Sequence, residues 1–339
     1  MKLRRLKPPL LLLGLFVLAI FPRAVRAGEA PFPRPEKSRI EIAIAAWGPT
    51  TLPLLVAQES GAFARHGLTV NISQVSASAA VQGVVSGAID IYQGGAAAIA
   101  AALAGANIIY VAAAVDRSSL VLFGQKGLTA FEMLRGKSVA TTSPGAFGEI
   151  AMRMTARKYG MEIGRDIKLL YHRSVQEALG TFLVGNADGL IITPPATETA
   201  RKQGYPVIVD YYKDGLKIIG PGTAVTRDFA QKYPNTLTAY LRACLDGVKR
   251  ALEDEEFAKK VDAKYEKISD AQALTENYQQ GARVWNKDMT VDPAAIRLVL
   301  DDSSDPKAKS ADPKTFYDNS LIEAVNRDYA SKLFPGAVK

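Results

Sequence analysis

The chain has 339 residues, of which 48% are hydrophobic and 22% charged, and its formal net charge at pH 7 is +8. Six of its basic residues and none of its acids lie in residues 1–27, so the rest of the chain carries +8 less 6, a net charge of +2. No basic run with interleaved aromatic residues remains outside that segment, which excludes nucleic acid as the expected partner.

Residues 1–27 have the three parts of a cleaved signal peptide: a basic start, an apolar run at Leu10–Phe21 and a small-residue cleavage sequence at Val25–Ala27. The apolar run has twelve residues, fewer than the roughly 20 that span a bilayer. The pattern therefore predicts export to the periplasm, and Arg4-Arg5 leaves the choice between the general secretory and twin-arginine routes open. Residues 28–37, with three prolines, are expected to be an extended lead-in.

The chain has one cysteine, Cys244, inside the helical pattern Leu237–Leu252. A single thiol forms no internal disulfide, and on an apolar helix face it is expected to be a small core residue. No cysteine follows the apolar leader, so a lipid-anchored form is not expected.

From residue 38 to 115, strands and helices are expected to alternate, which predicts parallel strands with helical crossovers. The expected strands are Ile40–Ala46, Leu68–Val75, Ala88–Tyr92 and Asn107–Val115. The expected helices begin at Pro53 and after Ser78, and a third covers Ala96–Ala104.

The same alternation recurs after residue 136. The expected strands are Lys137–Thr141, Lys168–Tyr171, Gly189–Ile192 and Val207–Asp210, and the expected helices are Ala146–Tyr159, Val175–Val184 and Pro195–Lys202. A Gly-x-x-Asp pattern precedes a strand in each half, at 87–90 and at 185–188. The repetition indicates two similar lobes.

After Asp210 the pattern predicts one more strand, Ile218–Thr226, and then only helices. These are Leu237–Leu252, Phe257–Tyr265, Asp270–Lys287, Ala294–Leu300 and Phe316–Lys332, and they are expected to cover the first lobe. The predicted lobes are 38–119 plus 220–339 and 120–219. The chain would cross between them near Ser118–Gly124 and Ile218–Thr223, forming a two-strand hinge. The fold class is α/β, with each lobe a central sheet flanked by helices.

Loops that follow parallel strands meet at one edge of a sheet, where small ligands bind. In the first lobe these loops are polar and rich in small residues. The candidate ligand-binding residues there are Trp47, Thr50, Thr51, Ser76, Ser78, Gln93 and Gly94. Each hydroxyl has the alternative role of a helix cap, and Trp47 has that of simple packing.

In the second lobe, a polar loop opens the long helix that begins near Ala146, and a helix N-terminus favours an anion. The candidates here are Thr142, Ser143, Ala146 and Phe147, with Thr193 and Pro194 at the end of another strand. Further candidates are Arg117 and Ser118 at the first crossing, and His172 and Arg173 after a strand. An arginine would bind a carboxylate or sulfonate through two hydrogen bonds, although each charged side chain has the alternative of a solvated surface position.

The sequence offers no catalytic constellation. Arg135-Gly136-Lys137-Ser138 resembles the end of a phosphate-binding loop, but position 131 is Phe where that loop requires Gly. Two histidines far apart and one cysteine make no transition-metal site. We expect neither a metal, nor a cofactor, nor catalysis.

The order of several short motifs, from about residue 38 to 250, resembles a known family. The motifs are Leu54-Leu55-Val56-Ala57, Gly61-Ala62-Phe63, Gly67-Leu68, Gly87-Ala88-Ile89-Asp90, Leu134-Arg135-Gly136-Lys137-Ser138-Val139, Gly185-Asn186-Ala187-Asp188 and Thr193-Pro194-Pro195. Together they resemble the type II periplasmic solute-binding proteins of ABC transporters, in the nitrate, sulfonate and taurine group that includes NMT1/THI5-like proteins. The resemblance implies a periplasmic-binding-protein-like II fold that closes on a small solute and delivers it to a membrane permease.

A small anionic organic solute such as a sulfonate, a nitrate-like anion or a carboxylate is expected, because such anions fit the helix N-termini, and the protein is expected to be a monomer. A thiamine-precursor pyrimidine, or another heteroaromatic compound, is the alternative if Trp47, Phe147 and Tyr92 line the cleft without an arginine. An alternative of another class is a secreted enzyme on the same fold. The chain lacks the cysteine-rich motif of the yeast-type pyrimidine synthases in this superfamily.

Overall fold

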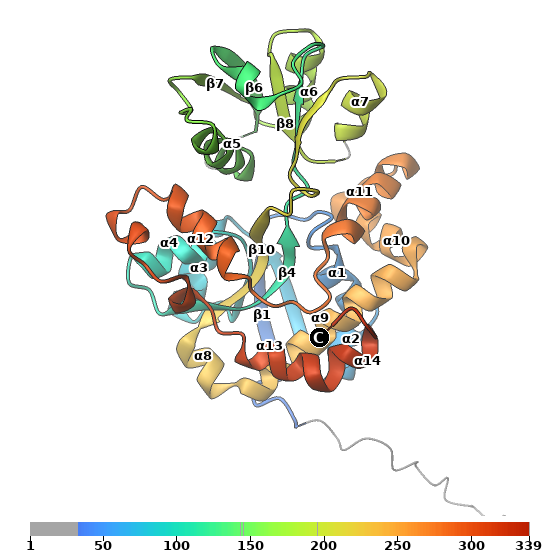
Figure 1. Ribbon diagram of the computed structural model, residues 1–339. Coiled ribbons are helices and arrows are strands. Elements are labelled where there is room, and N and C mark those ends of the chain that lie inside the picture. Colours follow the sequence, from blue (N-terminus) through green and yellow to red (C-terminus); the bar gives the residue numbers. More distant parts are fainter. Residues whose placement is uncertain (1–32, 143, 145, 195, 339) are drawn as a thin grey trace, which may run out of the picture. The chain divides into compact units, whose positions relative to one another are not determined.

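Two five-stranded sheets organise the computed structural model, which describes residues 33–142, 144, 146–194 and 196–338 (Figure 1). The predicted signal peptide, residues 1–27, and the first five residues of the predicted lead-in lie outside the described residues. None of the described helices combines the length and the apolar character needed to cross a bilayer.

The first sheet has the strand order β2-β1-β3-β10-β4. Its strands are β1 (Arg39–Ile44), β2 (Thr69–Gln74), β3 (Ile91–Gly94), β4 (Ile108–Arg117) and β10 (Lys217–Thr226). β1 pairs in parallel with β2 and β3, whereas β10 runs antiparallel to both β3 and β4.

The second sheet has the order β7-β6-β8-β5-β9. Its strands are β5 (Val121–Gly124), β6 (Lys137–Thr141), β7 (Ile167–Tyr171), β8 (Gly189–Ile192) and β9 (Val207–Asp210). β6 is parallel to β7 and β8, and β5 is antiparallel to β8 and β9.

The alternation of strands and helices predicted parallel strands, and β5 and β10 are the exceptions. Each is the strand on which the chain enters a sheet directly from the other sheet, through residues 118–120 or 211–216. The strand before each of them belongs to the other sheet, so neither is reached through the strand-helix-strand crossover that makes two strands of one sheet parallel. The predicted lobe limits themselves remain a prediction.

Helices cover both faces of the first sheet (Figure 1). One face carries α1 (Leu52–Glu59), α2 (Ala62–Arg65), α9 (Pro234–Glu253) and α10 (Glu255–Glu266), and the other carries α3 (Ala77–Ser86), α4 (Ala97–Leu103) and α12 (Pro293–Asp302). Every residue of α1 from Leu52 to Ala57 is buried, because α9 and α10 cover the side of α1 that faces away from the sheet.

The second sheet is covered on one face by α5 (Phe147–Lys158) and on the other by α6 (Val175–Leu183) and α7 (Ala196–Lys202). The C-terminal region adds α8 (Arg227–Lys232), α11 (Ala271–Val284), α13 (Ser320–Val325) and α14 (Ser331–Leu333), with a π-helical turn at Asn326–Ala330. Short 3₁₀ helices cover Phe131–Leu134, Pro306–Lys309 and Pro313–Phe316.

Two predicted elements begin several residues later than predicted. The predicted helix Phe316–Lys332 begins only at Ser320, because the backbone before it is extended: Tyr317 forms a bridge with Tyr110 of β4, and Asp318 N donates to Tyr110 O at 2.8 Å. The predicted strand Ala88–Tyr92 begins only at Ile91. The carboxylate of Asp90 accepts from Lys37 Nζ at 2.6 Å and from Glu41 N at 2.9 Å, which fixes a turn before the strand.

Candidate functional site

The loop after β1 is held from both sides. Thr51 Oγ1 donates to Gly48 O at 3.0 Å, and the indole Nε1 of Trp285 donates to Pro49 O at 2.8 Å. Trp47 is half-buried, with its ring 5.1 Å from the ring of Tyr265 on α10. Thr50 is half-buried, and its hydroxyl has no hydrogen bond within the described residues. The loop therefore has a fixed backbone at the carboxyl-terminal edge of the first sheet.

The loops after β2 and β3 reach the same edge, because Ile44 of β1 is in register with Gln74 and Gln93. Ser76 caps α3 by accepting from Ala79 N at 3.3 Å, and its hydroxyl lies 3.2 Å from that of Ser78. Both serines are exposed.

Gln93 is 3% exposed, and its amide is bound inside the protein. Its Nε2 donates to Pro221 O at 3.0 Å, while its Oε1 accepts from the hydroxyls of Thr223 at 2.8 Å and Tyr240 at 2.9 Å. Gly94 is required beside it, because a Cβ there would lie 2.0 Å from Cζ of Tyr92.

A contact joins this edge to the start of α5. A Cβ on Gly95 would lie 3.4 Å from Ile219 O and 3.8 Å from Cε2 of Phe147. Phe147 is the first residue of α5, and the N-cap of that helix, Ala146, has no side-chain oxygen to cap it. The predicted residue Phe147 thus lies beside Gly95, which follows the predicted residue Gly94 in the chain.

Two buried polar atoms beside α5 have no partner among the described residues. Thr141 Oγ1 and His172 Nε2 are both buried, and neither has a hydrogen bond to that part of the chain. They belong to neighbouring strand ends, since His172 N donates to Thr141 O at 3.0 Å. A Cβ on Gly148 of α5 would lie 2.7 Å from Thr141 Oγ1, so this hydroxyl faces the first turn of α5. The adjacent Thr142 is half-buried, and the predicted Ser143 lies outside the described residues.

Arg173 and Ser118 have other neighbours. Arg173 is exposed, and its N donates to Glu177 Oε2 at 3.0 Å in the first turn of α6. Ser118 is buried in the first crossing, where its N donates to Leu216 O at 3.0 Å and its hydroxyl accepts from Leu120 N at 3.2 Å. Ser118 therefore joins the two crossing segments.

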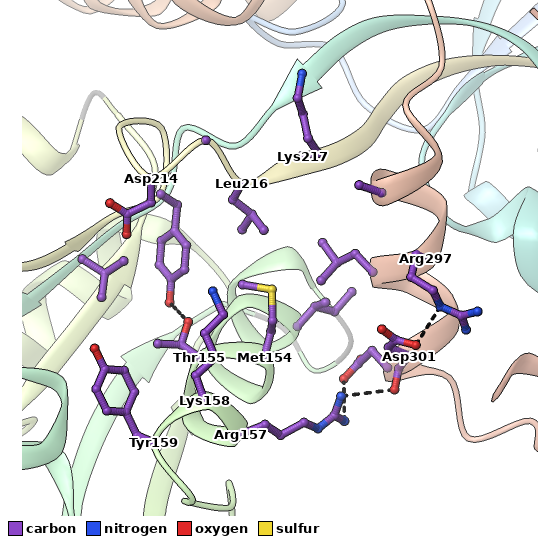
Figure 2. Close-up of a pocket in the computed structure, with 17 residues that line it drawn as sticks. Met154, Thr155, Arg157, Lys158, Tyr159, Asp214, Leu216, Lys217, Arg297 and Asp301 are labelled. Carbon is purple, nitrogen blue, oxygen red and sulfur yellow. Dashed lines mark hydrogen bonds and ion pairs between the residues drawn. The ribbon is translucent and has the colours of Figure 1, made fainter. Parts of the chain in front are cut away.

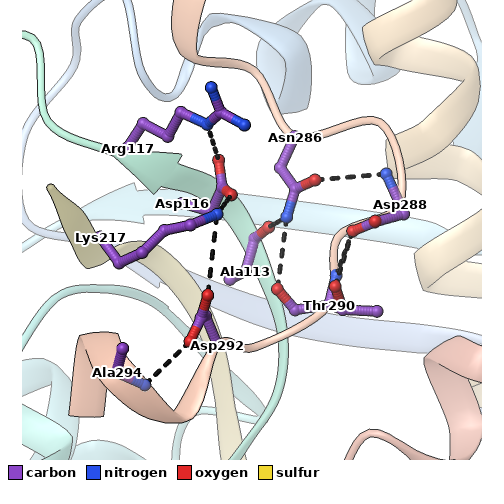
Figure 3. A network of polar contacts seen from close by, with 9 residues as sticks. All are labelled: Ala113, Asp116, Arg117, Lys217, Asn286, Asp288, Thr290, Asp292 and Ala294. Atoms are coloured by element: carbon purple, nitrogen blue, oxygen red, sulfur yellow. Dashed lines mark hydrogen bonds and ion pairs between the residues drawn. The ribbon is translucent and has the colours of Figure 1, made fainter. Parts of the chain in front are cut away.

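Arg117 belongs to a network of ion pairs and hydrogen bonds where β4 ends and β10 begins, which is called the hinge network here (Figure 3). Lys217 pairs with Asp116 and, at 3.7 Å, with Asp292 at the N-cap of α12. Arg117 is about half exposed, with Nε 3.9 Å from Asp116. These groups line a polar cavity of about 590 Å³. The network ties both crossing strands to α12.

A second cavity, of about 570 Å³, lies between α5, residues 211–217 and α12 (Figure 2). Its polar groups bind one another. Thr155 Oγ1 lies 2.9 Å from the Tyr211 hydroxyl, Arg157 donates to Asp301 O at 3.2 Å, and Arg297 pairs with Asp301 at 2.8 Å. The remaining walls are mostly apolar, as at Met154 and Leu216.

A third cavity, of about 440 Å³, is called the α7–α11 cavity here because those two helices supply its facing walls. It contains the predicted residue Pro194, which is half-buried like its neighbour Thr193. The opposite wall consists of Gln280 and Arg283 on α11. These two residues were not predicted, because α11 follows the last strand and belongs to no strand-loop-helix repeat. Their spacing of three, which places them on one helix face, was the available signal.

An acidic pair lies behind the loop after β1. A Cβ on Gly48 would lie 3.4 Å from Oε1 of Glu266, an oxygen that is buried and has no hydrogen bond to another described residue. Burial and the nearby Asp262 carboxylate raise the pKa of Glu266 to about 7, and the hydrogen bond from Asn277 opposes that shift. Burial likewise raises the pKa of Asp262.

Groups suited to covalent or metal chemistry are bound elsewhere. Burial raises the pKa of the Cys244 thiol to about 12. His66 lies 3.1 Å from Asp246, which also accepts from the Tyr329 hydroxyl at 2.6 Å. Among the described residues, no group of three or more His, Cys, Asp and Glu side chains is placed to hold a metal ion.

Several solved structures have a similar fold. The periplasmic aliphatic sulphonate binding protein SsuA of Escherichia coli aligns with a TM-score of 0.63 at 17% identity, over 89% of this chain and 90% of that one. The periplasmic nitrate-binding protein NrtA of Synechocystis aligns with a TM-score of 0.57 at 13% identity, over 90% and 93%. A Candida albicans gene product with the generic periplasmic binding protein fold aligns with a TM-score of 0.58 at 14% identity, over 83% and 96%.

These likenesses confirm the predicted two-lobed α/β fold of periplasmic binding proteins. No curated protein matches the chain in sequence. The model of the NMT1-like family matches residues 33–264, more than half of the chain, which therefore belongs to the NMT1-like family.

Proposed function

We propose that this chain is the periplasmic solute-binding component of an ABC importer. It captures a small anionic organic solute, such as a sulfonate, a nitrate-like anion or a carboxylate, and delivers it to a membrane permease. The predicted signal peptide supports export, and the likeness to sulphonate- and nitrate-binding proteins supports the solute class. The protein acts as a monomer and binds without a cofactor.

The observation that carries the proposal is the pair of unpartnered atoms at the start of α5, Thr141 Oγ1 and His172 Nε2. Buried polar side-chain atoms nearly always have a hydrogen-bond partner, and leaving one unsatisfied costs about 1–3 kcal/mol. The N-terminus of this 12-residue helix adds a positive potential beside them. A solute that forms hydrogen bonds with Thr141 Oγ1 and with His172 Nε2 would satisfy both atoms.

Loops of both sheets take part, so binding favours the arrangement in which they are close. Phe147, the first residue of α5, lies beside Gly95 at the edge of the first sheet, since a Cβ on Gly95 would come within 3.8 Å of its ring. A solute that touches both edges binds that arrangement more tightly than any arrangement in which they are apart. Binding therefore shifts the population towards closure, which is the state a permease can recognise.

The first test is native mass spectrometry of protein purified from the periplasm, followed by a thermal-shift screen. The panel contains alkanesulfonates, taurine, nitrate, short carboxylates and a thiamine-precursor pyrimidine. A ligand at 100 times its dissociation constant stabilises the fold by about 2.7 kcal/mol. Chemical turnover of the bound compound would contradict a receptor and support a secreted enzyme. The failure of every compound to bind would also contradict the proposed receptor.

The second test uses a matched pair of isosteric substitutions. Thr141→Val removes the unpartnered hydroxyl, so we expect about tenfold weaker solute binding with unchanged or higher stability. Thr155→Val is the control, because that hydroxyl is bonded to Ala151 O at 2.8 Å and to Tyr211 at 2.9 Å. The control should lose stability and keep its affinity. Equal affinities in the wild type and Thr141→Val would remove this hydroxyl from the site.

A further inference from the structure

We infer that Asp262 and Glu266 of α10, called the α10 carboxyl pair here, make the loop after β1 sensitive to pH, so that the protein binds its anionic solute more tightly when the pair holds a proton. The inference rests on the proposed function and assigns a form of regulation to it. The pair acts through the loop and through its charge, without touching the solute.

The α10 carboxyl pair lies where α10, α11 and the loop after β1 meet. α10 packs on α1 and on α11 (Figure 1). Oε1 of Glu266 is 3.4 Å from the position that a Cβ on Gly48 would take. The residue before it, Tyr265, places its ring 5.1 Å from that of Trp47 in the same loop. A change of charge at Glu266 therefore acts directly on this loop.

The contacts of the pair suit one negative charge better than two. Asp262 is 1% exposed, and its carboxylate accepts from Asn277 Nδ2 at 3.1 Å. The same Nδ2 lies 3.4 Å from Oε2 of Glu266, whose Oε1 is buried without a hydrogen bond to another described residue. Neither carboxylate forms an ion pair with a lysine or arginine in the part of the chain that the structure describes. Two carboxylates that share one amide repel each other, so one of them retains a proton.

The other charged groups of the surrounding elements bind one another or face solvent. Their ion pairs are Glu59–Lys264, Lys249–Glu253, Arg250–Asp254, and Lys259 with Glu255 and Glu256. The others are Lys260, Lys267 and Arg283, which are exposed, and Glu276, which binds Gln272 at 2.8 Å. Burial raises the pKa of both Tyr265 and Tyr278, and the loop after β1 has no charged side chain. No cation of these elements therefore contacts the pair within the described residues.

The direction of the effect follows from these charges. Burial and the Asp262 carboxylate raise the pKa of Glu266 to about 7. Below this pH the pair carries at most one negative charge, and above it the pair carries two. A bound anion further favours the protonated form. The affinity is therefore highest below about pH 7, falls as pH rises through 7, and becomes constant once Glu266 is ionised in both the free and the bound protein.

The first measurement reports the loop itself and needs no solute. The chain has two tryptophans, Trp47 in the loop and Trp285, and both are labelled with 5-fluorotryptophan in the exported protein. The fluorine NMR resonance of Trp47, assigned with Trp47→Phe, should shift with pH with a midpoint near 7. The shift should be absent in Glu266→Gln. In Asp262→Asn its midpoint should move to lower pH, because one of the two charges is gone.

The second measurement is the affinity for ethanesulfonate, butanesulfonate and nitrate, by titration calorimetry from pH 5.5 to 8.5 at constant ionic strength. These anions keep the same charge over that range. The wild type should lose about 3- to 10-fold in affinity between the two limits. Glu266→Gln should keep more of its affinity at pH 8.5 by that factor, and other titrating groups affect both proteins alike. Glu256→Gln is the control, since this exposed glutamate pairs with Lys259, and it should follow the wild type in both measurements.

Two results would overturn the inference. In one, the Trp47 resonance is constant over the pH range, or its transition persists in Glu266→Gln. In the other, the wild type and Glu266→Gln lose affinity in parallel as pH rises. Both results leave the receptor function intact, because the anions still bind. Failure of every anion to bind contradicts the proposed function and this regulation with it, so the two failures are distinguishable.

Discussion

Gln93 connects three elements through one buried amide, since its partners lie on β10 and α9. Gln93→Leu keeps the approximate shape and removes all three hydrogen bonds, leaving Pro221 O and two hydroxyls buried. We expect the free energy of unfolding to fall by about 2–4 kcal/mol, measured by urea denaturation. Gln74→Leu, at the exposed end of β2, should change it by less than about 0.5 kcal/mol. Equal effects of the two substitutions would contradict this role of Gln93.

Glu266 predicts a dependence of stability on pH. Its pKa is raised from 4.5 to about 7 in the folded protein, because burial and Asp262 disfavour the carboxylate. As pH rises, the unfolded chain releases this proton before the folded protein does. The carboxyl therefore contributes fully to the free energy of unfolding below about pH 4.5, and this contribution is lost as pH rises through about 7. The side chain in Glu266→Gln stays neutral at every pH. The variant should therefore be more stable than the wild type by about 1–2 kcal/mol above pH 7, and the two proteins should be equally stable near pH 4.5.

The measurement for Glu266 is a series of urea denaturations from pH 4.5 to 8. Its control is Glu256→Gln, because Glu256 is an exposed glutamate in the first turn of α10 that pairs with Lys259. The difference between Glu266→Gln and the wild type should grow across this range, and a constant difference would show that the carboxyl is not linked to folding there.

The sequence predicts which loops reach a strand end but not where each side chain points. Ser76 precedes a helix, and its capping role follows from local sequence alone. By contrast, the partners of Gln93 on β10 and α9 lie more than a hundred positions away in the chain. No local pattern contains that information.

At the scale of elements, the contact between α1 and α9 depends on a glycine. A Cβ on Gly247 of α9 would lie 2.2 Å from Pro53 O and 2.8 Å from Cβ of Ala57. Gly247→Ala must therefore push the two helices apart, and we expect it to lower the free energy of unfolding by about 2–4 kcal/mol. Gly180→Ala in α6 is the matched control. It meets no atom within 4 Å, so the better helix former should raise stability by about 0.5–1 kcal/mol.

We expect the two glycine substitutions to change the free energy of unfolding in opposite directions when both are measured under the same denaturing conditions. A stabilising Gly247→Ala would contradict the close packing of α1 on α9. The same substitution in two helix interiors separates helix propensity, which is common to both, from the steric contact, which only Gly247 has.

Elements with a clear period were predicted well from the sequence. The limits of β6, β8 and β9 agree residue for residue, and α9 was predicted from its apolar spacing. The crossing near Ser118–Gly124 was predicted as a hinge strand, but the place of its last four residues, β5, in the second sheet was not, because no helix precedes them. The last helix was predicted to begin too early, because the residues before it are extended and pair with β4. That pairing joins segments about 200 positions apart, which no local pattern reveals.

At the scale of the whole molecule, an ion-pair cluster joins α5, which covers the second sheet, to α12, which covers the first. Arg153 Nε lies 2.9 Å from Asp302, Arg153 Nη2 lies 2.6 Å from Glu149, and Arg157 lies 3.7 Å from Asp302. Because α5 also begins at the proposed solute site, the cluster stabilises the same arrangement that the solute favours. Its loss should therefore weaken solute binding without touching the solute.

Asp302→Asn removes the carboxylate that Arg153 and Arg157 share. Arg153 is about one-third exposed, so the pair contributes no more than about 1 kcal/mol, and solute affinity should fall by at most about fivefold. Titration at low and at high ionic strength provides the check, because screening weakens the ion pair in the wild type and the difference between the two proteins should shrink in salt. Arg250→Gln is the control, since it breaks an ion pair inside one helix and its cap, with Asp254. A loss of affinity in Asp302→Asn that stays the same at high salt would show that the carboxylate acts through hydrogen bonding or packing rather than through its charge.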